Sequence, residues 1–130
     1  MIGTLAGFLL VIAGIALALW TNSVLGWRRL LWLSDEPPHP ALPQLVFAGP
    51  YRVVRHPFFL SMLMVFGGAT AATRSLACAA AFLLASVLVA VLAWQEERRL
   101  VIRFGEAYRR YQRVVPFLLP WPRRPLTASP

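Results

Sequence analysis

Lysine is absent from the sequence, and cysteine and acidic residues are scarce. The 130 residues include one cysteine, two histidines and five acids, against 13 basic residues that are all arginine. A single cysteine excludes a disulfide framework or a cysteine-based metal site within the chain. Two histidines and one cysteine also fall short of the usual zinc ligand set. We therefore expect no metal site.

Two signatures of soluble enzymes are missing as well. No strand is predicted, so there is no glycine-rich phosphate loop following a strand. The sequence also contains no G-x-S-x-G nucleophile elbow. These absences argue against the common nucleotide-binding loops and against serine hydrolase chemistry.

Apolar residues, by contrast, are abundant. Hydrophobic residues make up 58% of the chain and charged residues 14%, which is too apolar for a soluble domain of this size. Uncharged stretches at about 2–20, 57–73 and 75–94 are each predicted to cross a bilayer core about 30 Å thick. The net charge of +8 suits anionic lipid headgroups or an anionic cofactor. Long apolar runs are not typical of a nucleic-acid binder, so no nucleic acid is expected as a partner.

The segments outside these runs complete the predicted fold. Residues 95–113 predict an amphipathic helix on the cytoplasmic surface, in which Leu100, Phe104, Tyr108 and Tyr111 share one face. Residues 34–50 contain five prolines and predict a loop, and residues 122–130 a flexible tail. The predicted fold class is an all-α integral membrane protein with three transmembrane helices and a cytoplasmic amphipathic C-terminal helix, in one domain over residues 1–121.

The arginine positions predict an orientation in the membrane. Four arginines lie between the first and second predicted spans and eight follow the third, whereas only Arg74 lies on the other side. By the positive-inside rule, the N-terminus is expected outside and the C-terminus in the cytoplasm.

A histidine stands at the start of the second predicted span, in the segment GPYRVVRHP at Gly49–Pro57. Pro57 disfavours a helical conformation at His56 and suits a first helical turn, which fixes the entry into the span. With Tyr51 and the free N–H groups of that helix start, His56 is a candidate for binding an anionic or carboxylate-bearing ligand. The alternative is that Arg55 and His56 are interfacial polar residues capping a helix. Spacing alone does not decide between the two.

Two adjacent carboxylates, Glu96 and Glu97, follow the third predicted span. They have two interpretations. One is pairing with Arg98, Arg99 or other neighbours along the helix, worth about 0.3–0.5 kcal/mol for each exposed pair. The other is binding of a cationic ligand by a partly desolvated carboxylate. Pairing is the simpler interpretation on chemistry alone.

Two motifs resemble those of a known enzyme family: GPYRVVRHPFF at Gly49–Phe59 and EERRLVIRFGEAYRRYQRVVPFLLP at Glu96–Pro120. Their order, with a helical hairpin between them, resembles the isoprenylcysteine carboxyl methyltransferase and phospholipid methyltransferase family of integral membrane enzymes. The resemblance implies S-adenosylmethionine as methyl donor and a lipophilic acceptor, of isoprenylcysteine carboxylate or phospholipid type, that enters from the bilayer. It requires no metal and assigns no catalytic residue. The implied cofactor contacts are Gln44, Leu45, Val46, Tyr51, His56, Pro57, Phe58, Phe59 and Glu96.

The sequence departs from that family at positions that bear on the substrate. Leu92 occupies the position of an arginine that the prenylcysteine enzymes use for their substrate, and Phe59 replaces a common tyrosine. Arg55 and Arg103 are the remaining candidates for binding a substrate anion. The chain has fewer predicted spans than the larger members of that family. A second copy of the chain in a homo-oligomer is one source of the missing walls of the acceptor-binding site.

Two other functions remain open from the sequence. The first is a non-catalytic membrane protein of the same fold that binds anionic lipid or a partner. The second is a membrane reductase of similar helical build that uses a nicotinamide dinucleotide. The paired motifs favour methyl transfer, whereas similarity of fold alone would not distinguish the three.

Overall fold

The computed structural model describes residues 1–26 and 48–121. All the regular elements in this part of the chain are helices, which confirms the predicted all-helical class, and no strand occurs in it. The predicted tail at 122–130 and most of the predicted proline-rich loop lie outside the described residues. The elements are α1 (Ile2–Leu25), the 3-10 helix η1 (Gly49–Arg52), α3 (Pro57–Thr73), α4 (Leu76–Phe104) and α5 (Glu106–Val114).

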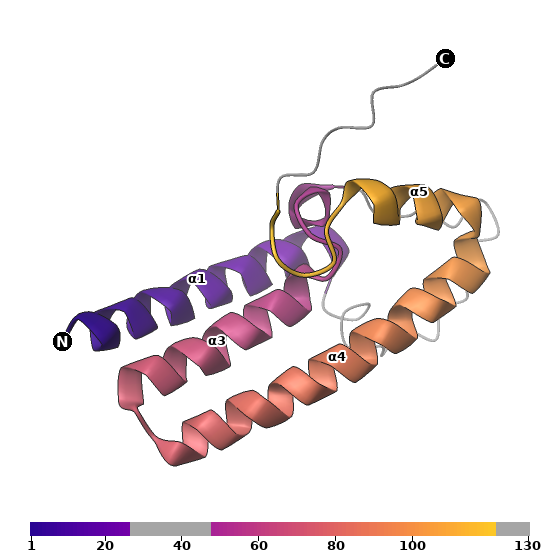
Figure 1. Cartoon of the computed structure of the whole chain (residues 1–130). Coiled ribbons are helices and arrows are strands. Elements are labelled where there is room, and N and C mark those ends of the chain that lie inside the picture. The colour runs from indigo at the N-terminus through magenta and orange to yellow at the C-terminus, as the bar shows by residue number, and fades with distance from the viewer. Residues whose placement is uncertain (27–47, 122–130) are drawn as a thin grey trace.

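Helices α1 and α3 pack side by side with their backbones in close approach (Figure 1). A Cβ atom built on Gly68 would lie 2.7 Å from the carbonyl oxygen of Gly7, and one on Gly14 would lie 2.9 Å from that of Ser61. Small residues permit such contacts between helices in lipid, where burial of apolar surface gives no driving force for association. Along these contacts, earlier residues of α1 lie beside later residues of α3, so the two helices are antiparallel.

Helix α4 packs on the other side of α3, after a short turn in which Arg74 adopts a left-handed conformation with φ of 51°. Its packing face carries Ala85, Val89 and Ala93, which are spaced four residues apart and buried. Gly67 of α3 approaches the ring of Phe82, since a Cβ there would lie 3.3 Å from it. The order α1, α3, α4 is therefore also the spatial order of the bundle (Figure 1).

The C-terminal part of α4 differs from the prediction of a span over 75–94 followed by a separate helix over 95–113. One helix continues to Phe104, because neither proline nor glycine interrupts the sequence after Trp94. The break comes at Gly105, with φ of 55° and ψ of −126°, a conformation that glycine adopts most readily. The predicted apolar face is present, but it is folded across this bend. Tyr108, Tyr111 and Val115 pack there against Leu100, Val101 and Phe104.

Two helices, over Ile2–Val24 and Leu76–Phe104, are long and apolar enough to cross a membrane. Helix α3 is apolar over 17 residues, shorter than the roughly 20 of an upright crossing, so a third span stays a prediction. Large apolar side chains are exposed along α1 and α4, among them Leu9, Leu83 and Val87. Exposed apolar surface of this extent is typical of a face that contacts lipid.

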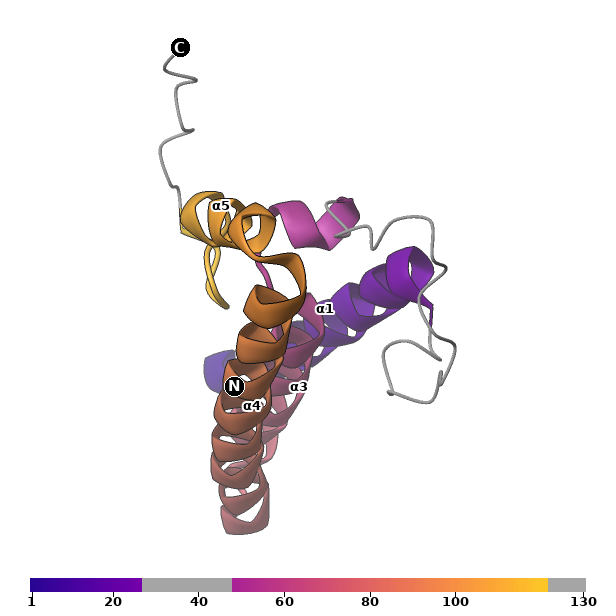
Figure 2. The ribbon, with the colours of Figure 1, turned by 90° about the vertical axis from the view of Figure 1, so that its right-hand side faces the viewer.

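All the polar contacts described next lie at one end of the bundle. There η1, the start of α3, the end of α4 and α5 come together, at the end opposite the turn between α3 and α4 (Figures 1 and 2). Segments more than 40 residues apart in the sequence therefore contribute side chains to one site, as the contact between His56 and Glu97 shows.

Candidate functional site

His56 lies at the N-terminal cap of α3, immediately before Pro57. The proline ring holds the first turn of the helix and directs the preceding residue out of helical geometry, with φ of −124° and ψ of 63° at His56. The imidazole is 4% exposed. It stacks on Phe59 with ring centroids 5.6 Å apart and meets the ring of Phe117 edge-on at 4.9 Å.

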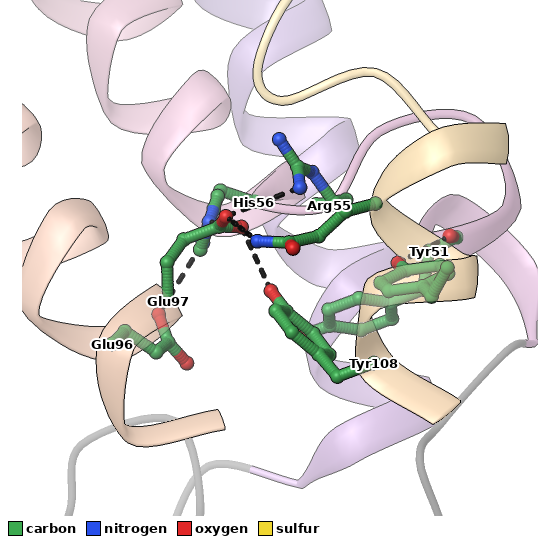
Figure 3. A network of polar contacts seen from close by, with 8 residues as sticks. Tyr51, Arg55, His56, Glu96, Glu97 and Tyr108 are labelled. Atoms are coloured by element: carbon green, nitrogen blue, oxygen red, sulfur yellow. Dashed lines mark hydrogen bonds and ion pairs between the residues drawn. The ribbon is translucent and has the colours of Figure 1, made fainter. Parts of the chain in front are cut away.

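Both nitrogens of this imidazole contact a carboxylate (Figure 3). The His56 Nδ1 atom lies 3.3 Å from Glu96 Oε2, and Nε2 lies 3.0 Å from Glu97 Oε1. A neutral imidazole has one N–H donor, whereas the imidazolium has two, so contacts of both nitrogens with carboxylates favour the charged form. Burial by itself lowers the pKa of His56, but the hydrogen bonds and negative charges of Glu96 and Glu97 outweigh it and raise the pKa above its ordinary value of 6.5.

Glu97 is the centre of the polar cluster. Besides His56, its carboxylate accepts hydrogen bonds from the Tyr108 hydroxyl at 2.7 Å and from the Gln112 side-chain amide at 2.5 Å. It also pairs with Arg55 Nη1 at 3.1 Å. The Glu97 side chain is 13% exposed. Its charge is thus compensated by donors from the start of α3 and from α5 (Figure 3).

Tyrosines connect η1 with α5 beside this cluster. The Tyr111 hydroxyl donates to the backbone carbonyl of Tyr51 at 2.7 Å. Burial raises the pKa of Tyr51, Tyr108 and Tyr111, and a second effect adds in each: the charge of Glu96 for Tyr51, the hydrogen bond to Glu97 for Tyr108 and the electrostatic influence of Tyr51 for Tyr111. These phenols therefore remain protonated donors at neutral pH.

Arg55 is held by its backbone as well as its side chain. Its N–H donates to the carbonyl of Pro116 at 2.9 Å, and its guanidinium lies over the ring of Phe117, 5.4 Å from the centroid. The side chain is 9% exposed, and its Nε atom is buried without a hydrogen-bond partner. Arg55 thus joins the segment after α5 to the start of α3.

Most of the predicted site residues meet at this end of the bundle. Tyr51, Arg55, His56, Phe59 and Glu96 all belong to the cluster, and Pro57 is buried at the start of α3. The pairing interpretation placed the partners of the two glutamates along their own helix, at Arg98, Arg99 or other neighbours. However, the structure shows that both contact His56, which belongs to a different element from their own helix.

Some predicted site residues lie elsewhere. Phe58 lines an apolar groove between α1 and α3. Arg103 is exposed near the end of α4, with its guanidinium over the ring of Phe104. Gln44, Leu45 and Val46 lie outside the described residues.

Three side chains of the cluster were not predicted as site residues: Glu97, Tyr108 and Gln112. The last two are four residues apart and therefore share one face of α5. That spacing was the available signal, but only Tyr108 was considered, and it was assigned to an apolar face. The bend at Gly105, which directs this face toward Glu97, is not apparent from periodicity.

The apolar groove holds a volume of about 240 Å³. Its walls come from the second half of α1 and the first half of α3, and it begins at Phe58, two residues from His56. Among the described residues, no group of three or more histidine, cysteine or acidic side chains is arranged to hold a metal ion. The lining residues are Ile15, Ala18, Leu19, Phe58, Ser61, Met62, Val65 and Phe66.

The bundle consists of long apolar helices and carries a buried histidine–carboxylate cluster at one end. This arrangement is typical of helical membrane proteins that have a polar site beside the bilayer. The chain belongs to the phospholipid methyltransferase family, whose family model matches residues 2–107. This confirms the family predicted from the two motifs. The two long apolar helices agree with membership in a family of membrane methyltransferases.

Curated relatives of the chain have a methyltransferase activity in their names. Methanethiol S-methyltransferase 1 of Bradyrhizobium diazoefficiens is 34% identical over 96 residues, which are 74% of this chain and 31% of that protein. The methanethiol S-methyltransferase of Mycobacterium tuberculosis is 39% identical over 74 residues, 57% of this chain and 30% of that protein. The chain thus matches less than a third of the length of either relative. No solved structure matches it.

Proposed function

We propose that the chain is an S-adenosylmethionine-dependent methyltransferase that acts on a lipophilic acceptor at the cytoplasmic face of a membrane. The observation that carries this proposal is the state of Glu96. Its side chain is 34% exposed and contacts His56 through one oxygen, so it retains acceptor capacity for a cationic ligand. Glu96 lies toward the polar end of the apolar helix α4, and the chain belongs to a family of methyltransferases.

The residues of the cluster fit S-adenosylmethionine chemically. That molecule carries a positive sulfonium and an amino-acid end, and when bound it supplies an electrophilic methyl group. A carboxylate and aromatic faces suit its positive charges. We assign Glu96, Tyr51, His56 and Phe59 to its binding.

The acceptor is proposed to be apolar, because the groove that begins at Phe58 has wholly apolar walls. Leu92, at 44% exposure, offers no positive charge where the prenylcysteine enzymes carry an arginine, which disfavours a carboxylate acceptor. The names of the curated relatives make a small apolar thiol the first acceptor to test, ahead of a phospholipid.

Calorimetric titration of the detergent-purified protein with S-adenosylmethionine and S-adenosylhomocysteine tests cofactor binding. We expect saturable one-site binding by the wild type, weakened in Glu96→Gln and in His56→Ala. Glu106→Gln is the matched control, because Glu106 is 54% exposed and pairs with Arg113 on the surface of α5. Its binding is expected to equal that of the wild type.

Methyl transfer is then measured from labelled donor to methanethiol, to a phospholipid extract and to an S-prenylated N-acetylcysteine. Transfer to the thiol supports the acceptor class proposed here, and transfer only to the prenylated carboxylate contradicts it. A folded wild type that binds neither donor nor product refutes the methyltransferase proposal. Binding of anionic vesicles alone then indicates the non-catalytic function, and binding of a nicotinamide dinucleotide indicates the reductase.

A further inference from the structure

The two adjacent glutamates of α4 differ sharply in their surroundings. Glu97 Oε1 accepts from His56 Nε2 and from the Tyr108 hydroxyl, while Oε2 accepts from Gln112 and pairs with Arg55. A carboxylate offers about four acceptor sites, so these donors saturate Glu97. It has no capacity left for a ligand.

Glu96 has the opposite character. Among the described residues, its polar partner is His56 Nδ1 alone, at 3.3 Å, and a third of its side chain is exposed. Consecutive helix residues point about 100° apart. One carboxylate can therefore be enclosed by protein while its neighbour is more exposed, as the side-chain exposures of 13% for Glu97 and 34% for Glu96 show.

His56 is shared between these two carboxylates. Its ring is fixed by the contact with Glu97 on one nitrogen and by the rings of Phe59 and Phe117. The charged imidazole in turn holds Glu96 from one side. The orientation of Glu96 thus depends on Glu97 through a buried histidine.

Glu97 also holds the C-terminal segment against the site. Tyr108 and Gln112 reach it from one face of α5, and Arg55, which binds Glu97, donates through its backbone to Pro116. Removing the carboxylate would take one acceptor from each of four donors, on His56, Tyr108, Gln112 and Arg55, and a buried donor left unsatisfied is costly. Glu97 is therefore the polar anchor of α5, beside the hydrogen bond from Tyr111 to the Tyr51 carbonyl and the apolar packing of α5 on α4.

We propose that Glu97 is a positioning residue: it binds no ligand itself, but fixes His56 and α5 so that Glu96 is presented to the cationic methyl donor. This division of roles rests on the proposed function for its ligand, although the positioning of His56 and α5 does not.

The experiment compares Glu97→Gln with Glu96→Gln in the full chain in detergent micelles. A His39→Gln background leaves His56 as the one histidine of the sequence, so that its ring can be titrated by NMR. Hydrogen exchange of α5 and calorimetric binding of S-adenosylmethionine are measured on the same samples.

For Glu97→Gln, we expect α5 amides to exchange about tenfold faster or more, as loss of a charged hydrogen-bond partner implies. The His56 titration midpoint should move to lower pH, and donor binding should weaken although Glu96 is intact. For Glu96→Gln, we expect weaker binding with unchanged exchange in α5. Tyr108→Phe removes one donor to Glu97 and should raise α5 exchange by a smaller factor.

Unchanged α5 exchange and an unmoved His56 midpoint in Glu97→Gln would overturn the proposal. So would an equal acceleration of α5 exchange in Glu96→Gln. If Glu97→Gln does not fold, Tyr108→Phe decides, since α5 exchange identical to the wild type contradicts the role of Glu97. If the wild type binds no donor, the proposed function fails, while exchange and titration still decide whether Glu97 positions His56 and α5.

Discussion

At the scale of single residues, the charge of His56 connects pH to the integrity of the site. The buried ring contacts Glu96 and Glu97 through its two nitrogens, and Arg55 supplies the other positive charge. With His56 charged, two positive and two negative side chains balance. When His56 loses its proton, one of the two hydrogen bonds is lost and the cluster gains net negative charge.

The pH dependence of stability follows from this balance. Because the pKa of His56 is raised on folding, its contribution to stability is fully present below its unfolded-state value and is lost as pH rises through the folded-state value. We expect the thermal unfolding midpoint of the wild type to fall as the pH rises above the unfolded-state pKa of about 6.5. His56→Gln should show a smaller fall over the same range. Equal slopes for the two proteins would contradict this account.

At the scale of elements, the sequence predicts where helices occur better than where they end. The uncharged stretches at 2–20 and 57–73 correspond to α1 and α3, because their apolar composition and flanking polar residues are local properties. The junction between α4 and α5 was misplaced. Trp94 and the charges after it mark a change in polarity, but a helix tolerates such a change and ends only at Gly105.

The site was predictable to a similar extent. His56, Tyr51 and Glu96 lie in motifs that local spacing and family resemblance both single out. Glu97 could not be distinguished from its neighbour in the same way, because the difference between them is made by Tyr108 and Gln112 after the bend. Contacts across a bend are set by tertiary packing rather than by local pattern.

The close packing of α1 on α3 gives a prediction at this scale. In Gly68→Ala, the new Cβ would lie 2.7 Å from the Gly7 carbonyl oxygen and 2.9 Å from the Val11 backbone nitrogen. Backbone atoms cannot move aside cheaply, so we expect a loss of about 1–3 kcal/mol in unfolding free energy. Gly3→Ala is the control, because its nearest neighbour is the end of the Arg74 side chain at 3.8 Å. Denaturant titration in micelles measures both, and equal stabilities would argue against this helix pairing.

At the scale of the whole molecule, the exposed apolar faces and the polar end divide the protein into a lipid-facing part and a site. Leu84 is 63% exposed in the apolar half of α4, and Ile102 is 85% exposed in its polar half. Both are accessible aliphatic side chains on one helix. Leu84 lies within the predicted span over residues 75–94, whereas Ile102 lies outside it.

Arginine substitutions at these two positions test that division. Leu84→Arg places a charge near the middle of the predicted span, where it costs about 2.5–3.5 kcal/mol on insertion scales. We expect this variant to insert poorly into microsomal membranes, as measured by glycosylation of engineered acceptor sites. Ile102→Arg should insert as the wild type does. Equal insertion of both variants would contradict the predicted placement of α4 in the bilayer.

Helix α4 runs without a break from its apolar start to the polar cluster. Bilayer thickness therefore affects the geometry of the site. A helix of 29 residues is a rod of about 44 Å. Thinner or thicker lipid changes the tilt of such a rod. Because Glu96 and Glu97 lie on the rod itself while His56 lies on α3, a change in tilt displaces carboxylates relative to imidazole. The lipid composition around the protein thereby enters the geometry of the site.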